Sequence, residues 1–294
     1  MDHWTGSGVL KATINWGTVV TVEAHQVLHF RTRRRSWLGV ASQLPIHRLP
    51  IYGSLAAAVL ISVVAPNVRA QDSGDGFLFQ QPSASFTLSG GFSHAAAAGD
   101  LFSFVTNTLT LNKSDFNSPL FGADVALRVA PRMDVALSTS YAGTSTPSSF
   151  RHLVDQNNAE IRQVTDLRRV PVMLSVRAYL EPQGRSVGKF AWVPAKFAPY
   201  VGVGGGAMWY RFNQHGDFVN FQTNKVFTGQ FTSSQWAPAA QGMAGLDFNL
   251  SPRVALTGEA KYIWAKGKLD QSFSGFNSID LSGISTTIGL TFRY

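Results

Sequence analysis

The sequence lacks cysteine altogether and has little charge. The absence of cysteine excludes disulfides, thiolate zinc sites and a cysteine nucleophile. Asp, Glu, Lys and Arg make up 14% of the 294 residues, against roughly 25% in typical soluble domains. Long apolar runs are also missing: the run 55–65 is too short for a transmembrane helix, which needs about 20 residues. Residues 71–294 show no convincing helical periodicity.

The formal charge of +8 does not indicate nucleic-acid binding. Seven of the 25 basic residues, but only Asp2 and Glu23 of the 17 acidic ones, precede residue 71. The rest of the chain therefore holds 18 basic and 15 acidic residues, a balance of +3. That excess is too small to predict a nucleic-acid partner.

Residues 46–70 are typical of a secretory signal peptide. His47 and Arg48 precede the apolar run, and small residues lead to a cleavage point near Ala70. Because such signals begin at the initiator, residues 1–45 indicate a start codon placed too far upstream, or an unusually long basic leader. We expect Sec-type export and a mature chain of 71–294.

The segment 282–294 alternates between two kinds of residue. Ile284, Ile288, Leu290 and Phe292 fall on one face, and small or polar residues separate them. Side chains alternate faces along a strand, so the pattern predicts a β-strand. Its length is close to the roughly 9–11 residues that cross a bilayer at a tilt.

Seven earlier segments repeat the alternation, which predicts eight strands. The connections after odd-numbered strands are long and polar, and two of the three after even-numbered strands are very short. This order predicts an antiparallel, up-and-down sheet. The strands are expected at 85–93, 118–130, 134–143, 169–180, 197–212, 235–250, 253–265 and 282–294, with long loops at 94–117, 144–160, 213–233 and 268–279.

Three features favour a barrel with its apolar face outward. The polar faces carry Ser, Thr, Gly and sparse charges instead of dense Lys and Glu. Aromatic residues gather toward strand ends, as membrane interfaces require. The strands are long enough to cross a bilayer, and closure removes edges that lipid would not tolerate. The sequence predicts an all-β, eight-stranded antiparallel up-and-down transmembrane β-barrel.

Three stretches carry a resemblance to a known family: 170–180 (VPVMLSVRAYL), 199–207 (PYVGVGGGA) and 289–294 (GLTFRY). They resemble the small bacterial outer-membrane β-barrel family, which includes the transmembrane domain of outer-membrane protein A and the smaller W and X proteins. The resemblance covers roughly 80–294 and implies periplasmic termini and external loops in a Gram-negative outer membrane. It also implies an assembly signal for the barrel-insertion machinery at Ile288, Leu290, Phe292 and Tyr294, where such signals favour a terminal Phe.

The inward-facing charges are the candidate functional residues. An eight-stranded barrel is only just wide enough to be filled by side chains, so opposite charges inside it must pair or stay partly hydrated. We interpret them as a structural polar plug, with a gate or narrow polar pore as the alternative and catalysis as a third. The predicted lumen-facing cluster is Asp124, Arg128, Asp134, Arg177, Asp247, Glu259, Lys261 and Arg293.

No cofactor or metal is predicted. The run 202–207 fits a dinucleotide fingerprint, but that motif needs a following helix, and here a strand pattern continues. His94, His152 and His215 have no metal-ligand spacing. Ser93 and His94 are adjacent, as a lipid-modifying enzyme would require, but neighbours in a strand face opposite ways.

We therefore expect a monomeric, non-enzymatic outer-membrane barrel with a structural, surface-interaction or small-solute role, in contact with outer-membrane lipid. The alternatives are a lipid-modifying barrel enzyme and a secreted soluble barrel that carries a hydrophobic ligand.

Overall fold

Eight antiparallel strands form a closed ring. The computed structural model describes residues 76–188, 191–221, 223 and 225–294, so the predictions for 1–70 lie outside the described residues. Around the ring the order is β1-β2-β3-β4-β7-β8-β9-β11, and β11 pairs with β1. The predicted eight-stranded up-and-down barrel is confirmed. The strands are β1 (Ala84–Ala95), β2 (Ser118–Ala130), β3 (Met133–Val154), β4 (Glu160–Tyr179), β7 (Phe197–Asn220), β8 (Lys225–Asn249), β9 (Val254–Gly267) and β11 (Gly283–Arg293).

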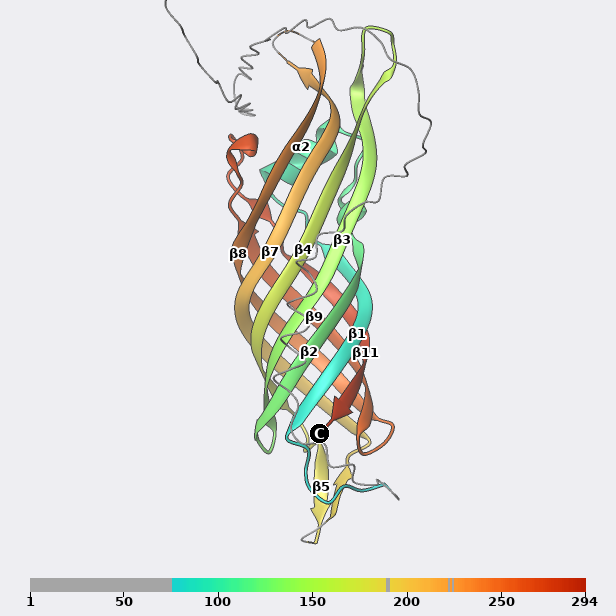
Figure 1. Ribbon diagram of the computed structural model, residues 1–294, viewed down its shortest axis with the longest axis vertical. Helices are drawn as coiled ribbons and strands as arrows, with labels where there is room; N and C mark the ends of the chain where they lie inside the picture. Colours follow the sequence, from blue (N-terminus) through green and yellow to red (C-terminus); the bar gives the residue numbers. More distant parts are fainter. Residues whose placement is uncertain (1–75, 189–190, 222, 224) are drawn as a thin grey trace, which may run out of the picture. The chain divides into compact units, whose positions relative to one another are not determined.

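The connections define two ends of the barrel (Figure 1). The turn end carries the short connections 131–132 and 250–253, the start of β1 and the carboxyl terminus. It also carries a small hairpin of β5 (Gly184–Val187) and β6 (Ala191–Pro194). The loop end carries α2 (Asp100–Thr108), η1 (Lys113–Phe116), η2 (Gln271–Phe273) and β10 (Ile279–Asp280), which pairs with β9.

Four strands are much longer than the sequence pattern predicted. β3, β4, β7 and β8 have 20 to 25 residues each, whereas the other four have 11 to 14. The four therefore rise beyond the loop end of the ring as a tall sheet (Figure 1). The predicted loops 144–160 and 213–233 are wrong in extent, because most of each is strand and the connections shrink to 155–159 and 221–224.

The ring turns its apolar side chains outward. Val203 and Ile288 are 69% and 66% exposed, whereas the inward Arg177 and Asp247 are 5% and 4% exposed. Between the outward aromatic pairs Phe197–Phe248 and Trp209–Trp236, every described outward strand position is apolar or uncharged. The inverted pattern predicted from the sequence is therefore present.

Beyond the Trp209–Trp236 pair the apolar face changes sides. On β4, Val170 faces outward. Leu167 and Ile161, which lie three and nine residues nearer the loop end, face inward and are each 2% exposed. Most of the outward positions there are polar, as in Arg168 and Arg162. The tall sheet thus has a mostly polar outside and an inner face whose apolar side chains are buried.

An apolar cluster, here called the cap core, fills the loop end. The inner face of the tall sheet packs against α2 and the segment 268–282. Phe102 of α2 lies 4.8 Å from Phe116 and 6.2 Å from Phe212 between ring centroids, and Phe212 lies 5.4 Å from Phe273. The prediction that residues 71–294 contain no helix was wrong at α2. Within the described ranges, no helix has the length and apolarity to cross a membrane. Members of the cap core include Leu101, Phe102, Val105, Leu109, Leu111, Phe116, Leu167, Phe212, Phe218, Phe231, Phe273, Ile279 and Leu281.

Candidate functional site

The barrel interior toward the turn end holds a network of ion pairs. Each member is held at an inward strand position, because alternate residues of a strand point to one face. Six different strands contribute, so the network forms only when the ring is closed. The eight residues named from the sequence lie on β2 (Asp124, Arg128), β3 (Asp134), β4 (Arg177), β8 (Asp247), β9 (Glu259, Lys261) and β11 (Arg293).

Arg177 is the centre of the network. Its guanidinium lies 3.0 Å from a carboxylate oxygen of Asp124 and 3.4 Å from one of Glu259. Glu259 also accepts from Lys261 Nζ at 2.7 Å and from the Tyr200 hydroxyl at 2.8 Å. The Tyr200 ring lies beneath the guanidinium, 5.3 Å from centroid to Cζ. Two carboxylates and two cations from three strands are thereby joined to one another and to Tyr200 of a fourth strand.

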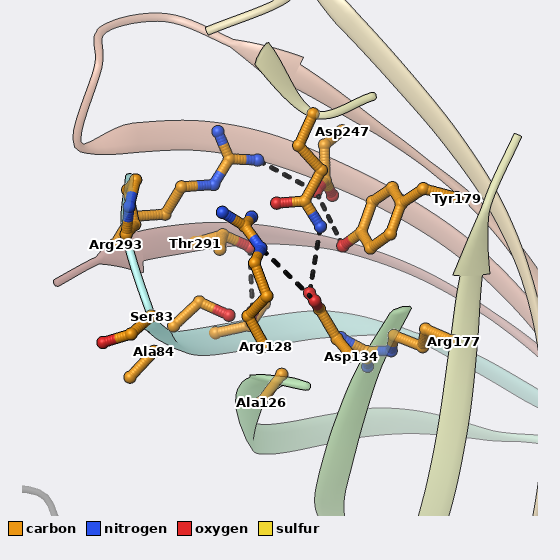
Figure 2. Close-up of a pocket in the computed structure, with 14 residues that line it drawn as sticks. Ser83, Ala84, Ala126, Arg128, Asp134, Arg177, Tyr179, Asp247, Thr291 and Arg293 are labelled. Atoms are coloured by element: carbon orange, nitrogen blue, oxygen red, sulfur yellow. Dashed lines mark hydrogen bonds and ion pairs between the residues drawn. The ribbon is translucent and has the colours of Figure 1, made fainter. Parts of the chain in front are cut away.

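A second group lies closer to the turn end (Figure 2). Arg293 donates to Asp247 at 3.0 Å, and the same carboxylate accepts from Thr257 at 2.7 Å and from Tyr179 at 3.4 Å. Thr257 and Thr291 hydroxyls are 2.6 Å apart. Such a fully bonded group meets the condition under which a buried ion pair is tolerated.

The third pair, Arg128 and Asp134, is looser. Its closest nitrogen–oxygen distance is 3.7 Å, an ion-pair separation without a hydrogen bond. Gln183, from the β4–β5 connection, donates to the other Asp134 oxygen at 3.0 Å. The connection therefore places a polar side chain against the ion pairs at the turn end. The cavity between these groups has a volume of about 10 Å³, room for about one water molecule.

Arg169 is a fifth interior cation, which sequence analysis did not name as a site residue. It is 5% exposed and lies between the ion pairs and the cap core. Its guanidinium donates to the Ser93 hydroxyl at 3.0 Å, and no carboxylate of the described residues lies within ion-pair distance. It lines a cavity of about 20 Å³ together with Ser140 and Ser285.

The tyrosines were also missed as members of the site. Tyr179 and Tyr200 stand at inward positions, which the alternation indicates, but only charged side chains were named as candidate functional residues of the lumen. Tyr200 fits because Gly245, its neighbour across β8, has no side chain: a Cβ there would lie 2.3 Å from the Tyr200 ring.

The glycine run of β7 spares interior volume in the same way. A Cβ on Gly204 would lie 2.4 Å from the Ser175 hydroxyl, and one on Gly206 would lie 2.1 Å from the Val172 carbonyl oxygen. The run lies inside β7. No helix follows it, so it lacks the helix N-terminus that a dinucleotide site requires.

The histidines do not form a catalytic or metal arrangement in the described part of the chain. Ser93 faces inward and bonds Arg169, whereas His94 faces outward and is exposed beside Phe92, 5.0 Å between ring centroids. His215 lies 3.7 Å from Asp166. No group of three or more potential metal ligands occurs among the described residues.

The four residues of the expected assembly signal lie on the outside of β11 and at its end. Ile288 and Leu290 are 66% and 45% exposed, Tyr294 is 49% exposed, and Phe292 is half-buried. The Tyr294 backbone bonds to Ser83 and Ala84 at the start of β1, which closes the ring at its last residue.

Comparisons with known proteins bear on the fold alone. No protein-family model matches the chain, and no curated protein matches it. Solved structures to which it is similar include that of the outer membrane protein OprG from Pseudomonas aeruginosa. The two sequences are 14% identical, the match covers 74% of this chain and 99% of that chain, and the TM-score is 0.43. Neisserial surface protein A has 11% identity, with 75% and 98% covered and a TM-score of 0.39.

The outer membrane protein AlkL in lipid bilayers has 15% identity, with 78% and 96% covered and a TM-score of 0.33. These likenesses transfer no function. The architecture rests on the strand pairing of this chain.

Proposed function

We propose that this protein is an integral outer-membrane β-barrel with a closed lumen, acting as a structural or surface-interaction protein. The observation that supports membrane insertion is the uncharged outward band. Its bounding aromatic residues Phe197 and Trp209 are 12 residues apart on β7. At about 3.3 Å per residue and a tilt of about 40°, they are separated by roughly 30 Å along the barrel axis. That is the thickness of a bilayer's apolar core.

The interior supports a closed lumen. At the turn end, the ion pairs and their hydroxyl partners leave cavities of only about 10 to 20 Å³. At the loop end, the cap core fills the interior with apolar side chains. Passage of a solute would require both to move, so the structure favours a plug over a pore. The polar outer face of the tall sheet is then the surface offered to partners.

The two alternatives have less support. A soluble ligand carrier would keep its apolar side chains inside, but here the charges are inside. A lipid-modifying enzyme would need a serine and a base on one face, and Ser93 and His94 face opposite ways.

Membrane insertion is tested by fractionation of cells that express the full chain. We expect the protein in the outer-membrane fraction, extracted only by detergent, with a gel mobility that shifts on boiling. Protease added to intact cells should cut at the loop end, including 96–117, and leave the turn end intact. Recovery in the soluble fraction without detergent would contradict the proposal.

Lumen closure needs its own measurement. We expect no steady ion conductance when the purified protein is added to planar bilayers. Stable, reproducible conductance steps would favour the pore interpretation instead.

The assembly role of β11 remains a proposal, supported by its place at the closure of the ring. Replacement of Tyr294 by Ala should slow insertion into membranes that contain the insertion machinery, while Tyr294→Phe should match or exceed the original rate. Equal insertion of all three proteins would argue against a role for this position.

A further inference from the structure

Two arginines face outward side by side, one step beyond the aromatic row at the loop end. Arg168 of β4 and Arg211 of β7 are direct partners across the strand pair, and both are exposed. Cross-strand partners have Cβ atoms about 4.5–5.5 Å apart, so the two guanidinium groups share one patch of the outer wall. Next to them toward the turn end is the pair Val170 and Trp209.

Neither arginine has an acidic partner among the described residues. No ion pair includes either of them. The outward Asp166, two residues along β4, accepts from Asn213 at 2.9 Å and lies 3.7 Å from His215. The Asp270 carboxylate accepts hydrogen bonds from the Ser234 backbone N–H and from the Gln235 side-chain amide. Like charges directly opposite each other destabilise a sheet, and a bound anion would remove that cost.

Hydroxyl groups flank the arginines in the same row. Gly143 is the β3 partner of Arg168, and the Tyr141 hydroxyl lies 2.8 Å from where a Cβ on Gly143 would be. The hydroxyl therefore lies over Gly143, beside Arg168. Ser234 is the β8 partner of Arg211. Four neighbouring strands thus present hydroxyl, guanidinium, guanidinium and hydroxyl, all able to donate to an anion.

The height of this row indicates which anion. The arginine row lies two residues beyond Trp209 on a tilted strand, which places it roughly 5 Å further from the bilayer centre. Interfacial tryptophans lie at the level of the lipid headgroups. Guanidinium groups bind phosphate oxygens in pairs of parallel hydrogen bonds. We propose that Arg168 and Arg211, with the Tyr141 and Ser234 hydroxyls, form a binding site for the phosphate of a phosphorylated lipid in the leaflet at the loop end. This inference rests on the proposed membrane insertion.

The opposite interface has a different arrangement. At the aromatic row of the turn end, Lys196 Nζ lies 5.9 Å from the ring centroids of both Phe197 and Phe248. That row therefore carries a single ammonium over two rings instead of a pair of guanidinium groups. Near the loop end, Lys266 lies opposite Asp280 in the β9–β10 pair. An adjacent pair of arginines with no acid opposite is therefore a feature of the β4–β7 wall.

The test uses the full chain in phosphatidylcholine nanodiscs, with or without diphosphoryl lipid A as the probe. Retention of the probe by the protein is measured by native mass spectrometry, and its effect on thermal unfolding is recorded. We expect the original protein to retain the probe and the double variant R168A/R211A to bind it about tenfold more weakly or worse. R168K/R211K should fall between, because lysine lacks the planar fork.

Two control variants keep the test specific. Arg162 lies on the same face of β4, six residues further from the aromatic row, and is paired with Glu160. Arg185 lies on β5 at the turn end. R162A and R185A should bind the probe like the original protein.

Equal binding by R168A/R211A would overturn the inference, as would equal stabilisation by inorganic phosphate alone. Failure to enter nanodiscs at all would instead refute the membrane proposal on which it rests.

Discussion

At the scale of single residues, the described part of the barrel interior contains four carboxylates and five cations. Four of the cations lie within 4 Å of a carboxylate, and Arg169 does not. The alternation of each strand predicted which residues face inward, including the eight of the cluster. It did not predict their pairing, because each pair depends on the strand register and on side-chain length. Arg169 stands at the first residue of the predicted strand 169–180, and it was not named in the cluster.

Removal of Arg177 should be costly. Arg177→Ala leaves Asp124 and Glu259 without their shared cation in a buried interior. We expect a loss of about 3–5 kcal/mol in the free energy of unfolding, measured by urea titration of the protein in detergent. The matched control Arg162→Ala breaks an exposed pair and should cost about 0–1 kcal/mol. Similar values for the two variants would show that the interior network is not stabilising.

Removal of Arg169 should have the opposite outcome. Among the described residues, no carboxylate lies within ion-pair distance of Arg169, and Arg169→Met replaces this buried cation with an apolar side chain of similar length. Apolar replacements of buried ionic groups are often neutral or stabilising. We therefore expect the free energy of unfolding to stay within about 1 kcal/mol or to rise, in the same urea titration. A loss as large as that of Arg177→Ala would mean that Arg169 has an ionic partner in solution.

At the scale of elements, the boundaries of β3, β4, β7 and β8 were mispredicted because their apolar face changes sides. Within the band the apolar residues face lipid, and beyond Trp209 they face the cap core. A period-2 pattern that changes phase looks like the end of a strand. The apolar face changes sides around Trp209. Trp209 faces outward, and its neighbours Met208 and Tyr210 face inward and are buried, so both faces of the strand are apolar at this point.

The helix α2 was missed because it depends on tertiary packing, which the local sequence pattern does not show. It has nine residues, too few to be stable alone. Its N-cap residue is Gly99, with φ of 97°, which has no side chain to make a capping hydrogen bond. Its apolar residues Leu101, Phe102 and Val105 are buried only because the tall sheet offers an apolar inner face. Such a helix is stabilised by tertiary contacts.

The cap core should open independently of the barrel. Phe102→Ala removes a fully buried ring between Phe116 and Phe212 and should weaken docking of α2 by about 3–5 kcal/mol. We expect faster amide hydrogen exchange and faster proteolysis at 96–117, with the boiling-dependent gel shift retained. Phe221→Ala, at a site 49% exposed, is the control and should change neither. Loss of the gel shift in Phe102→Ala would mean that cap and barrel unfold together.

At the scale of the whole barrel, the proposed bilayer divides each tall strand into two environments. The same substitution should therefore have different costs at different heights. Ile288→Lys places a charge near the middle of the uncharged band and should cost about 2–4 kcal/mol in lipid vesicles. Val164→Lys, also outward but beyond the aromatic row, should cost less than about 0.5 kcal/mol. Equal costs in vesicle refolding titrations would place both residues in water and remove the basis for insertion.

The sequence by itself determined the number of ring strands, their antiparallel order and the side of each that is apolar. These properties are local, because side-chain direction alternates with every residue and short turns join neighbours in space. Only the tertiary structure decided which charges meet, since partners such as Arg177 and Glu259 come from strands far apart in the chain. It also decided that α2 fills the loop end, because a short helix has no stable place until the sheet that buries it has formed.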